Sequence, residues 1–267
     1  MKTSNFILIL FLACYRLTFG VVPASLTGKG QVSIVSDELW SRAFNPSICP
    51  GHLRIAAGIS SEGHFLADDY GKYRFIAMTR KGKSAAGMHI YRAGTGRFHF
   101  GGMEFSYSNK LAEKFYAGIS MVNERWNYGA ESSERHSAWY GKAGLYSKPL
   151  DKLSVAFLIS NPGGQKWNNA MRLPIDKIII CALSYESSDN VHLYFQTNKY
   201  YGKEFSFHGG IEYRYQNQFT LRSGISSLPF TGSFGASLSW KKIVLDIGSE
   251  FHGNTGHRTM LSIAFQI

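Results

Sequence analysis

Prolines, cysteines and long apolar runs are all scarce in this sequence. Only seven of the 267 residues are proline and only three are cysteine, at Cys14, Cys49 and Cys181. Beyond residue 24 no run of about 18 apolar residues occurs, so no segment there can cross a bilayer as a helix. Cys49 and Cys181 could form one disulfide in an oxidising periplasm, but we expect two unpaired side chains. No zinc-type spacing is present.

Runs of like charge and catalytic motifs are also missing. The formal net charge is +11, but the basic residues are dispersed and their longest run is Lys241-Lys242. Dispersed charge argues against nucleic acid as a partner and favours contact with anionic outer-membrane lipid or lipopolysaccharide. No His-Glu-x-x-His, Gly-x-Ser-x-Gly, phosphate-loop or dinucleotide glycine pattern occurs. We therefore expect no enzyme activity, no catalytic residues, no metal site and no cofactor.

The N-terminus has the layout of a secretory signal peptide. Lys2 precedes an apolar run from Phe6 to Ala13, and a mixed stretch follows it. We expect removal of residues 1–20, with cleavage after residue 24 as a second option. Lipidation at Cys14 is the alternative, which Phe11 at the third position before the cysteine disfavours. An exported chain without a spanning helix is either a soluble fold or a transmembrane barrel.

The rest of the chain shows period-two alternation in many short segments. Between 205 and 215, Phe205, Phe207, Ile211 and Tyr213 share one face and polar residues share the other. We expect an all-β, antiparallel fold of about fourteen strands, close to residues 52–60, 72–80, 84–92, 99–108, 114–124, 137–147, 152–160, 176–187, 190–199, 204–215, 218–226, 231–240, 242–251 and 257–266.

Alternation alone fits both a soluble β-sandwich and a membrane barrel, but the links between strands distinguish the two. Links after even-numbered strands are short, as at 148–151 and 187–189, whereas several links after odd-numbered strands are long, as at 61–71 and 161–175. Short periplasmic turns that alternate with longer external loops are typical of outer-membrane barrels. A similar hairpin pattern recurs four times, which fits hairpins laid side by side in a closed wall.

The segment before the first strand has no clean alternation. Its stretch DELWSRAFNPS is interpreted as a short helix or turn that packs into the mouth of a barrel. We therefore divide the mature chain into an N-terminal segment or plug at 21–51 and a β-barrel at 52–267. The candidate plug residues are Trp40, Phe44, Asn45 and Pro46.

Four stretches carry a resemblance to a known family. They are Ala43-Phe44-Asn45-Pro46, YSKPLDKLSVAFLISNPGG, GGIEYRYQNQFTLRSGISS and the closing WKKIVLDIGSEFHGNTGHRTMLSIAFQI. They resemble the outer-membrane family of Bacteroidetes that includes PorV and PorQ, which is related in architecture to the FadL fatty-acid transporters. The resemblance implies a fourteen-stranded barrel with an N-terminal segment in the lumen. It also implies either type IX secretion, in which such barrels hold exported cargo, or passage of hydrophobic molecules.

Several charged residues fall on the polar face of the expected strands. An arginine or lysine that faces lipid at the bilayer midplane costs about 2 to 4 kcal/mol, so these groups should turn into the lumen and pair. We interpret them as struts rather than as the lining of a conducting path. Ser206 and His208 could suggest a hydrolase, but no third, orienting group can be assigned to them. The charged residues are Glu104, Glu212, Arg214, Arg222, Asp246, Glu250 and Arg258.

Two functions follow for a multi-pass barrel in the bacterial outer membrane. The first is a non-catalytic binding or scaffold component of surface secretion, of the PorV/PorQ kind, with secretion-machinery proteins or exported cargo as partners. The alternative is a FadL-like transporter of hydrophobic small molecules. A continuous apolar path past Phe44 and Trp40 would favour transport, whereas a lumen closed by charged pairs would favour the scaffold.

Overall fold

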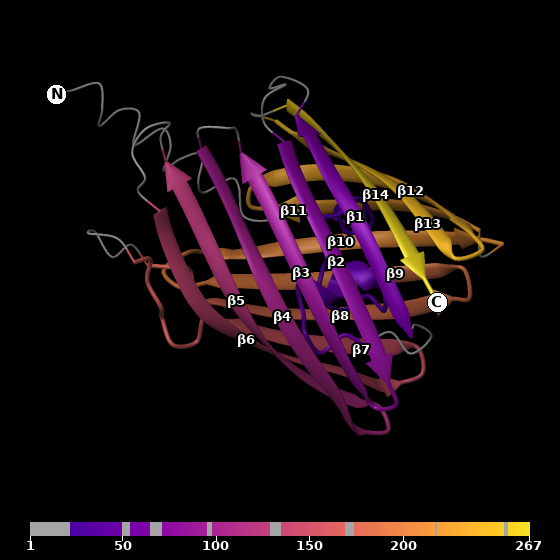
Figure 1. Cartoon of the computed structure of the whole chain (residues 1–267). Helices are drawn as coiled ribbons and strands as arrows, with labels where there is room; N and C mark the ends of the chain where they lie inside the picture. Colours follow the sequence, from indigo (N-terminus) through magenta and orange to yellow (C-terminus); the bar gives the residue numbers. More distant parts are fainter. Residues whose placement is uncertain are drawn as a thin grey trace.

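The chain folds into a closed, antiparallel barrel of fourteen strands (Figure 1). The computed structural model describes residues 22–49, 54–64, 71–94, 98–128, 135–168, 174–216, 218–253 and 256–267. Each strand pairs with its neighbours in sequence, and β1 pairs with β14 to close the wall. The strands are β1 (Ile55–His64), β2 (Gly71–Lys81), β3 (Ser84–Gly94), β4 (Phe98–Ala112), β5 (Phe115–Tyr128), β6 (Arg135–Leu150), β7 (Leu153–Ser160), β8 (Ile178–Ser188), β9 (Val191–Tyr200), β10 (Phe205–Tyr215), β11 (Phe219–Ser227), β12 (Phe230–Trp240), β13 (Ile243–His252) and β14 (Gly256–Gln266).

The apolar face of each strand points outward. In β10, Phe205 and Phe207 are about half exposed, whereas Ser206 and His208, on the other face, are buried. The same holds in β14, where Leu261 and Ile263 are exposed and Met260 and Ser262 are buried. A soluble sandwich would bury these apolar side chains, so their exposure excludes that alternative and identifies the outer surface as the lipid-facing one. The sequence-based prediction of a transmembrane barrel of the outer-membrane type is confirmed.

The lipid-facing surface gives a direct test. Ile263→Arg should reduce the stability of the folded barrel in lipid by about 2 to 4 kcal/mol if residue 263 lies near the midplane, because a guanidinium would face hydrocarbon. Ile263→Met keeps the site apolar and should cost little. Urea titrations of the two variants in phospholipid vesicles measure the difference. Equal stabilities would contradict the assignment of this face to lipid.

Ser262, on the opposite face of β14, does not tolerate replacement by a larger side chain. Its hydroxyl accepts a hydrogen bond from the Ala24 amide (3.0 Å) and donates one to Ser60 Oγ (2.9 Å). The sequence alone suggests that Ser262→Arg would be the milder change. The structure leaves no room for that side chain, because the lumen there is filled by the N-terminal segment.

The links between strands follow the expected parity. Those after even-numbered strands span 82–83, 113–114, 151–152, 189–190, 216–218 and 241–242, and the longest link after an odd-numbered strand spans 161–177. We call the end with the longer links the external end and the opposite end, where β14 finishes, the periplasmic end.

Residues 22–49 lie inside the barrel and form the plug. In Figure 1 this segment, drawn in indigo, lies between the wall of β1–β6 and the strands behind it. It contains two single-turn helices, α2 (Ala24–Thr27) and α3 (Leu39–Arg42), which contact β12–β14 and β1–β2 respectively. Within the described residues no helix is long and apolar enough to cross a membrane. The expected segment is therefore present, and it fills the interior rather than only the mouth.

Eight glycines on the inner face of the wall form a seat for the plug. At Gly210 and Gly248, a Cβ atom would lie 2.5 Å from the carbonyl oxygens of Lys29 and Ala24, closer than real Cβ contacts occur. The plug backbone therefore passes where the wall has no side chains. The plug seat comprises Gly58, Gly87, Gly118, Gly144, Gly210, Gly224, Gly235 and Gly248.

The position of Ala24 bears on processing of the chain. Its amide is bound to Ser262, and its carbonyl accepts the Gly28 amide at 3.0 Å. Cleavage after residue 24 would remove this residue from α2. We therefore propose cleavage after Gly20, although residues 1–21 lie outside the described residues.

Candidate functional site

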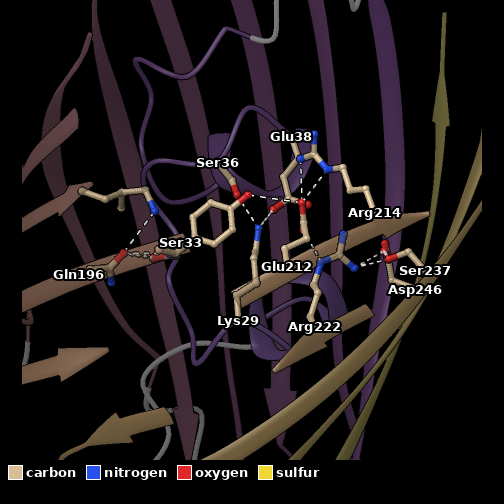
Figure 2. Close-up of polar contacts among 12 residues, drawn as sticks. Lys29, Ser33, Ser36, Glu38, Gln196, Glu212, Arg214, Arg222, Ser237 and Asp246 are labelled. Carbon is tan, nitrogen blue, oxygen red and sulfur yellow. Dashed lines mark hydrogen bonds and ion pairs between the residues drawn. The ribbon is translucent and has the colours of Figure 1, made fainter. Parts of the chain in front are cut away.

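The first of three charged clusters in the lumen joins the plug to the wall of β10, β11 and β13 (Figure 2). Arg222 Nε donates to Glu212 Oε2 at 2.7 Å, and its guanidinium lies 3.4 Å from Asp246 Oδ1. Arg214 contacts the other oxygen of Glu212 at 2.7 Å. From the plug, Lys29 donates to Ser36 and Glu38. This plug cluster (Lys29, Glu38, Glu212, Arg214, Arg222 and Asp246) balances three cations against three carboxylates.

Glu38 shows how the plug cluster keeps a partly buried charge. Burial alone would raise the pKa of the Glu38 carboxyl, but the positive charges of Lys29 and Arg222 outweigh it and leave that pKa below its ordinary value. Glu38 therefore stays ionised at neutral pH. It completes the charge balance that Lys29 and the two arginines require.

A second cluster lies where β1, β2, β13 and β14 meet. Lys72 Nζ donates to Glu62 Oε1 at 2.6 Å, and Arg258 bridges Glu62, at 3.3 Å, and Glu250. Gln31 of the plug donates to Glu250. Among the described residues, two cations again balance two carboxylates here.

The third cluster is on the opposite wall. Glu104 of β4 accepts a hydrogen bond from Lys142 at 2.8 Å, and His89 Nδ1 lies 3.5 Å from it. Glu124 accepts hydrogen bonds from Tyr91 and from Tyr140, the latter at 2.9 Å. Glu104 is therefore in a different cluster from Glu212, Arg222 and Asp246.

All seven charged residues predicted from the sequence point into the barrel, but they form three groups instead of one network. Only Arg214 is substantially exposed, with 45% of its side chain accessible. Sequence reasoning missed Lys29 and Glu38, because the plug has no periodicity. It could have found Glu62, Lys72 and Lys142, which occupy inward positions of their strands.

An apolar column follows the β2–β6 side of the lumen. At the external end Trp167 packs edge-on to Phe100 (6.3 Å between ring centroids), and Phe100 packs against Tyr91 (5.7 Å). Further in, Phe44 of the plug packs against a buried cluster that contains Trp40, Ile76 and Met78. We define the apolar column as Trp167, Phe100, Tyr91, Phe44, Trp40, Ile76 and Met78.

Arg74 connects the two halves of the column. Its guanidinium lies over the Phe44 ring at 4.8 Å and the Tyr91 ring at 5.6 Å from their centroids, and the residue is 5% exposed. Its Nε has no hydrogen-bond partner, and no ion pair of Arg74 occurs among the described residues. The aromatic faces therefore hold this cation mainly by cation–π attraction.

Ser206 and His208 are close but serve the plug. Ser206 Oγ lies 3.2 Å from His208 Nε2, while His208 Nδ1 lies 2.9 Å from the carbonyl oxygen of Gly30. Asn198 donates to Nε2 at 2.9 Å, so the contacts are satisfied when Nδ1 carries the proton. Within the part of the chain that the structure describes, no carboxylate contacts the ring, and both residues are buried beneath the plug. Their arrangement anchors Gly30 and offers no access to a substrate.

The two cysteines of the barrel do not pair. Cys49 is buried in the plug, whereas Cys181 is exposed on the outer face of β8. Their positions on opposite sides of the wall confirm two free thiols. Among the described residues no group of histidine, cysteine, aspartate and glutamate is arranged to hold a metal ion.

Several solved outer-membrane structures share this fold. The Ralstonia pickettii toluene transporter TbuX superposes with a TM-score of 0.70 at 14% identity, over 93% of this chain and 98% of that one. The CymD monoaromatic hydrocarbon channel gives 0.67 at 14% identity, over 92% and 97%. A Pseudomonas aeruginosa FadL homologue gives 0.64 at 13% identity, over 92% and 98%. No protein-family model and no curated protein sequence matches the chain.

These likenesses establish the architecture. The barrel has the fourteen-stranded fold of FadL-type outer-membrane proteins, and the predicted relation to that architecture is confirmed. Two of these similar structures are described as a transporter and a channel. None of the three structures named above is described as a PorV or PorQ protein, so that part of the resemblance stays a prediction.

Proposed function

We propose that this barrel lets hydrophobic small molecules cross the outer membrane along the apolar column. The observation that carries the proposal is the apolar column itself, whose external half (Trp167, Phe100 and Tyr91) and inner half (Phe44, Trp40, Ile76 and Met78) meet at Arg74. The similar fold of a toluene transporter and a monoaromatic hydrocarbon channel supports it.

The column is closed at rest and can open locally. Phe44 and Arg74 fill its middle, and Arg74 is held there by ring faces, with no ion pair among the described residues. Moving its side chain therefore breaks fewer strong contacts than moving Arg222, which bridges two carboxylates. We infer that a guest molecule displaces Phe44 and Arg74, while the plug seat and the plug cluster hold the rest of the plug in place.

Phe100→Ala tests this route. The change enlarges the external half of the column and removes a ring that a hydrophobic guest would contact, so the rate of entry should change several-fold. The probe is 1-N-phenylnaphthylamine, whose fluorescence rises in a membrane interior, added to cells that express the barrel in an outer membrane rich in lipopolysaccharide.

Phe234→Ala is the matched control, because Phe234 is 60% exposed on the lipid-facing surface. It should leave the rate of entry unchanged. If cells that express the unmodified barrel take up no more probe than cells that lack it, the transport proposal fails. Equal effects of the two substitutions would reject the column as the route.

The second candidate is a scaffold for surface secretion, of the type IX-associated kind. The charged clusters on the inner wall favour it, because two of them balance cations against carboxylates inside the lumen. Its partners would be secretion-machinery proteins or exported cargo at the external loops. An exported protein that copurifies in stoichiometric amounts, together with no entry of the probe, would place this function first.

A further inference from the structure

Three lysines gather at the external end of β8, β9 and β10. Lys177 precedes β8, Lys199 lies near the end of β9, and Lys203 lies in the link between β9 and β10. Lys199 Nζ donates to the carbonyl oxygen of Lys203 at 2.5 Å, and the Tyr201 amide donates to that of Lys177 at 2.9 Å. Segments separated in sequence are thereby held together. We call Lys177, Lys199 and Lys203 the external lysine cluster.

Aromatic rings lie beneath each of these ammonium groups. Lys199 is 4.5 Å from the Phe205 ring centroid, Lys203 is 5.1 Å from that of Tyr200, and Lys177 is 5.9 Å from that of Tyr201. The attraction of each ammonium group to its ring limits how far that group can move. Tyr201 itself is 81% exposed, beyond the edge of the wall. The cluster is therefore an ordered cationic surface with an aromatic base.

The carboxylates nearby do not neutralise this surface. Asp176 accepts a hydrogen bond from Lys203 at 2.7 Å and is the one carboxylate, among the described residues, in contact with the cluster. Glu204 is exposed next to Lys203 and makes no ion pair with any residue that the structure describes, while Lys166 adds a further positive charge in the link before β8. The external lysine cluster therefore keeps a net positive charge that a ligand can contact.

The position of the cluster relative to the hydrocarbon layer indicates what kind of ligand it meets. Lys199 is paired across the sheet with Ile179 and Phe205, which are 42% and 52% exposed on the lipid-facing surface. An outward lysine beside such residues is tolerated at the edge of the hydrocarbon and costly at its centre. Aromatic residues also gather at this boundary. The ammonium groups thus lie at the level of lipid head groups, in the leaflet at the external end.

We propose that the external lysine cluster binds the phosphate groups of lipid A, the phosphorylated lipid of the outer leaflet. The lysines would contact a phosphate, while Phe205, Phe207 and Ile179 contact the acyl chains below. This site lies on the outside of the barrel, so it is independent of the apolar column and of transport.

Native mass spectrometry of the detergent-purified barrel, titrated with bisphosphorylated lipid A, tests the proposal. Each basic residue near an anionic lipid surface contributes roughly fivefold in affinity, and Lys203 is already partly paired. The triple variant K177Q/K199Q/K203Q should therefore bind lipid A about tenfold or more weakly. Lipid A without phosphates should bind the unmodified barrel as weakly as the variant does.

The control removes the same charge at the opposite end. Lys114, Lys152 and Lys242 lie in exposed periplasmic turns, and K114Q/K152Q/K242Q should keep lipid A affinity within about twofold. Equal losses in both triple variants would show attraction by net charge alone and overturn the site. Displacement of lipid A by equimolar inorganic phosphate would show a site for free anions instead. Heat-modifiable migration of each variant confirms that the barrels compared are folded.

Discussion

Gly210→Ala should unseat the plug, whereas Gly209→Ala, one residue away, should change little. A Cβ atom at 210 would lie 2.5 Å from the Lys29 carbonyl oxygen and 2.9 Å from its carbon, both backbone atoms that no rotamer change can move. At Gly209, on the outer face, the nearest atom is a side-chain carbon of Ile225 at 3.8 Å. Overpacking typically costs about 1 to 3 kcal/mol, and contact with backbone places this case at the upper end.

Two measurements test this prediction. Planar-bilayer conductance should be nearly silent for the unmodified barrel and for Gly209→Ala, and clearly raised for Gly210→Ala, because a displaced plug leaves a path for water and ions. Limited proteolysis should cut the plug in that variant alone. If Gly210→Ala is as silent and as protease-resistant as Gly209→Ala, the plug is not held by the seat.

Arg222→Met should destabilise the barrel by about 3 to 5 kcal/mol, the usual cost of removing one partner from a buried ion pair. The change leaves Glu212 with Arg214, but it leaves Asp246 with only the hydroxyl of Ser237, on the neighbouring strand β12, as a hydrogen-bond donor among the described residues. Asp246→Asn removes that stranded charge and restores the balance of the cluster. Arg222→Met with Asp246→Asn should therefore recover most of the loss.

Glu212→Leu is the informative comparison. The sequence, which shows only that residues 212 and 222 can face each other, predicts that this change would rescue Arg222→Met. The structure predicts a poorer rescue, because Glu212→Leu also strands Arg214 and leaves Asp246 unpaired. Urea titrations followed by tryptophan fluorescence give the order of stabilities. A better rescue by Glu212→Leu, or a cost of Arg222→Met below about 1 kcal/mol, would mean that water screens these charges.

The wall was predictable because lipid and lumen impose opposite demands on alternate residues. All fourteen strands were found from this alternation, and the parity of the links excluded a sandwich. The errors concern length: β4, β5 and β6 run to Phe98–Ala112, Phe115–Tyr128 and Arg135–Leu150, beyond the expected ends. Where a strand leaves the bilayer, its outer face need not be apolar, so the pattern fades although the pairing continues.

The interior was much less predictable. The helices of the plug are four residues long, too short for a helical period to be visible. Lys29 and Glu38 look like ordinary surface residues in the sequence, because the arginines and carboxylates that surround them come from strands more than 150 positions away. Trp40, Phe44 and Asn45 could be nominated for the plug, but their depth in the lumen depends on a wall that the local sequence does not describe. For the same reason, the sequence did not show that the inward charged residues form three separate clusters.

The plug seat has a consequence for protein engineering and for comparing homologues. Because five of the glycines lie against the plug backbone and three against plug side chains, plug and wall are not interchangeable parts. A plug taken from another barrel would need glycines at matching inward positions, or it would meet side chains where it must lie flat. Conversely, inward glycines in an aligned homologue would map the route of its own plug before any coordinates are known.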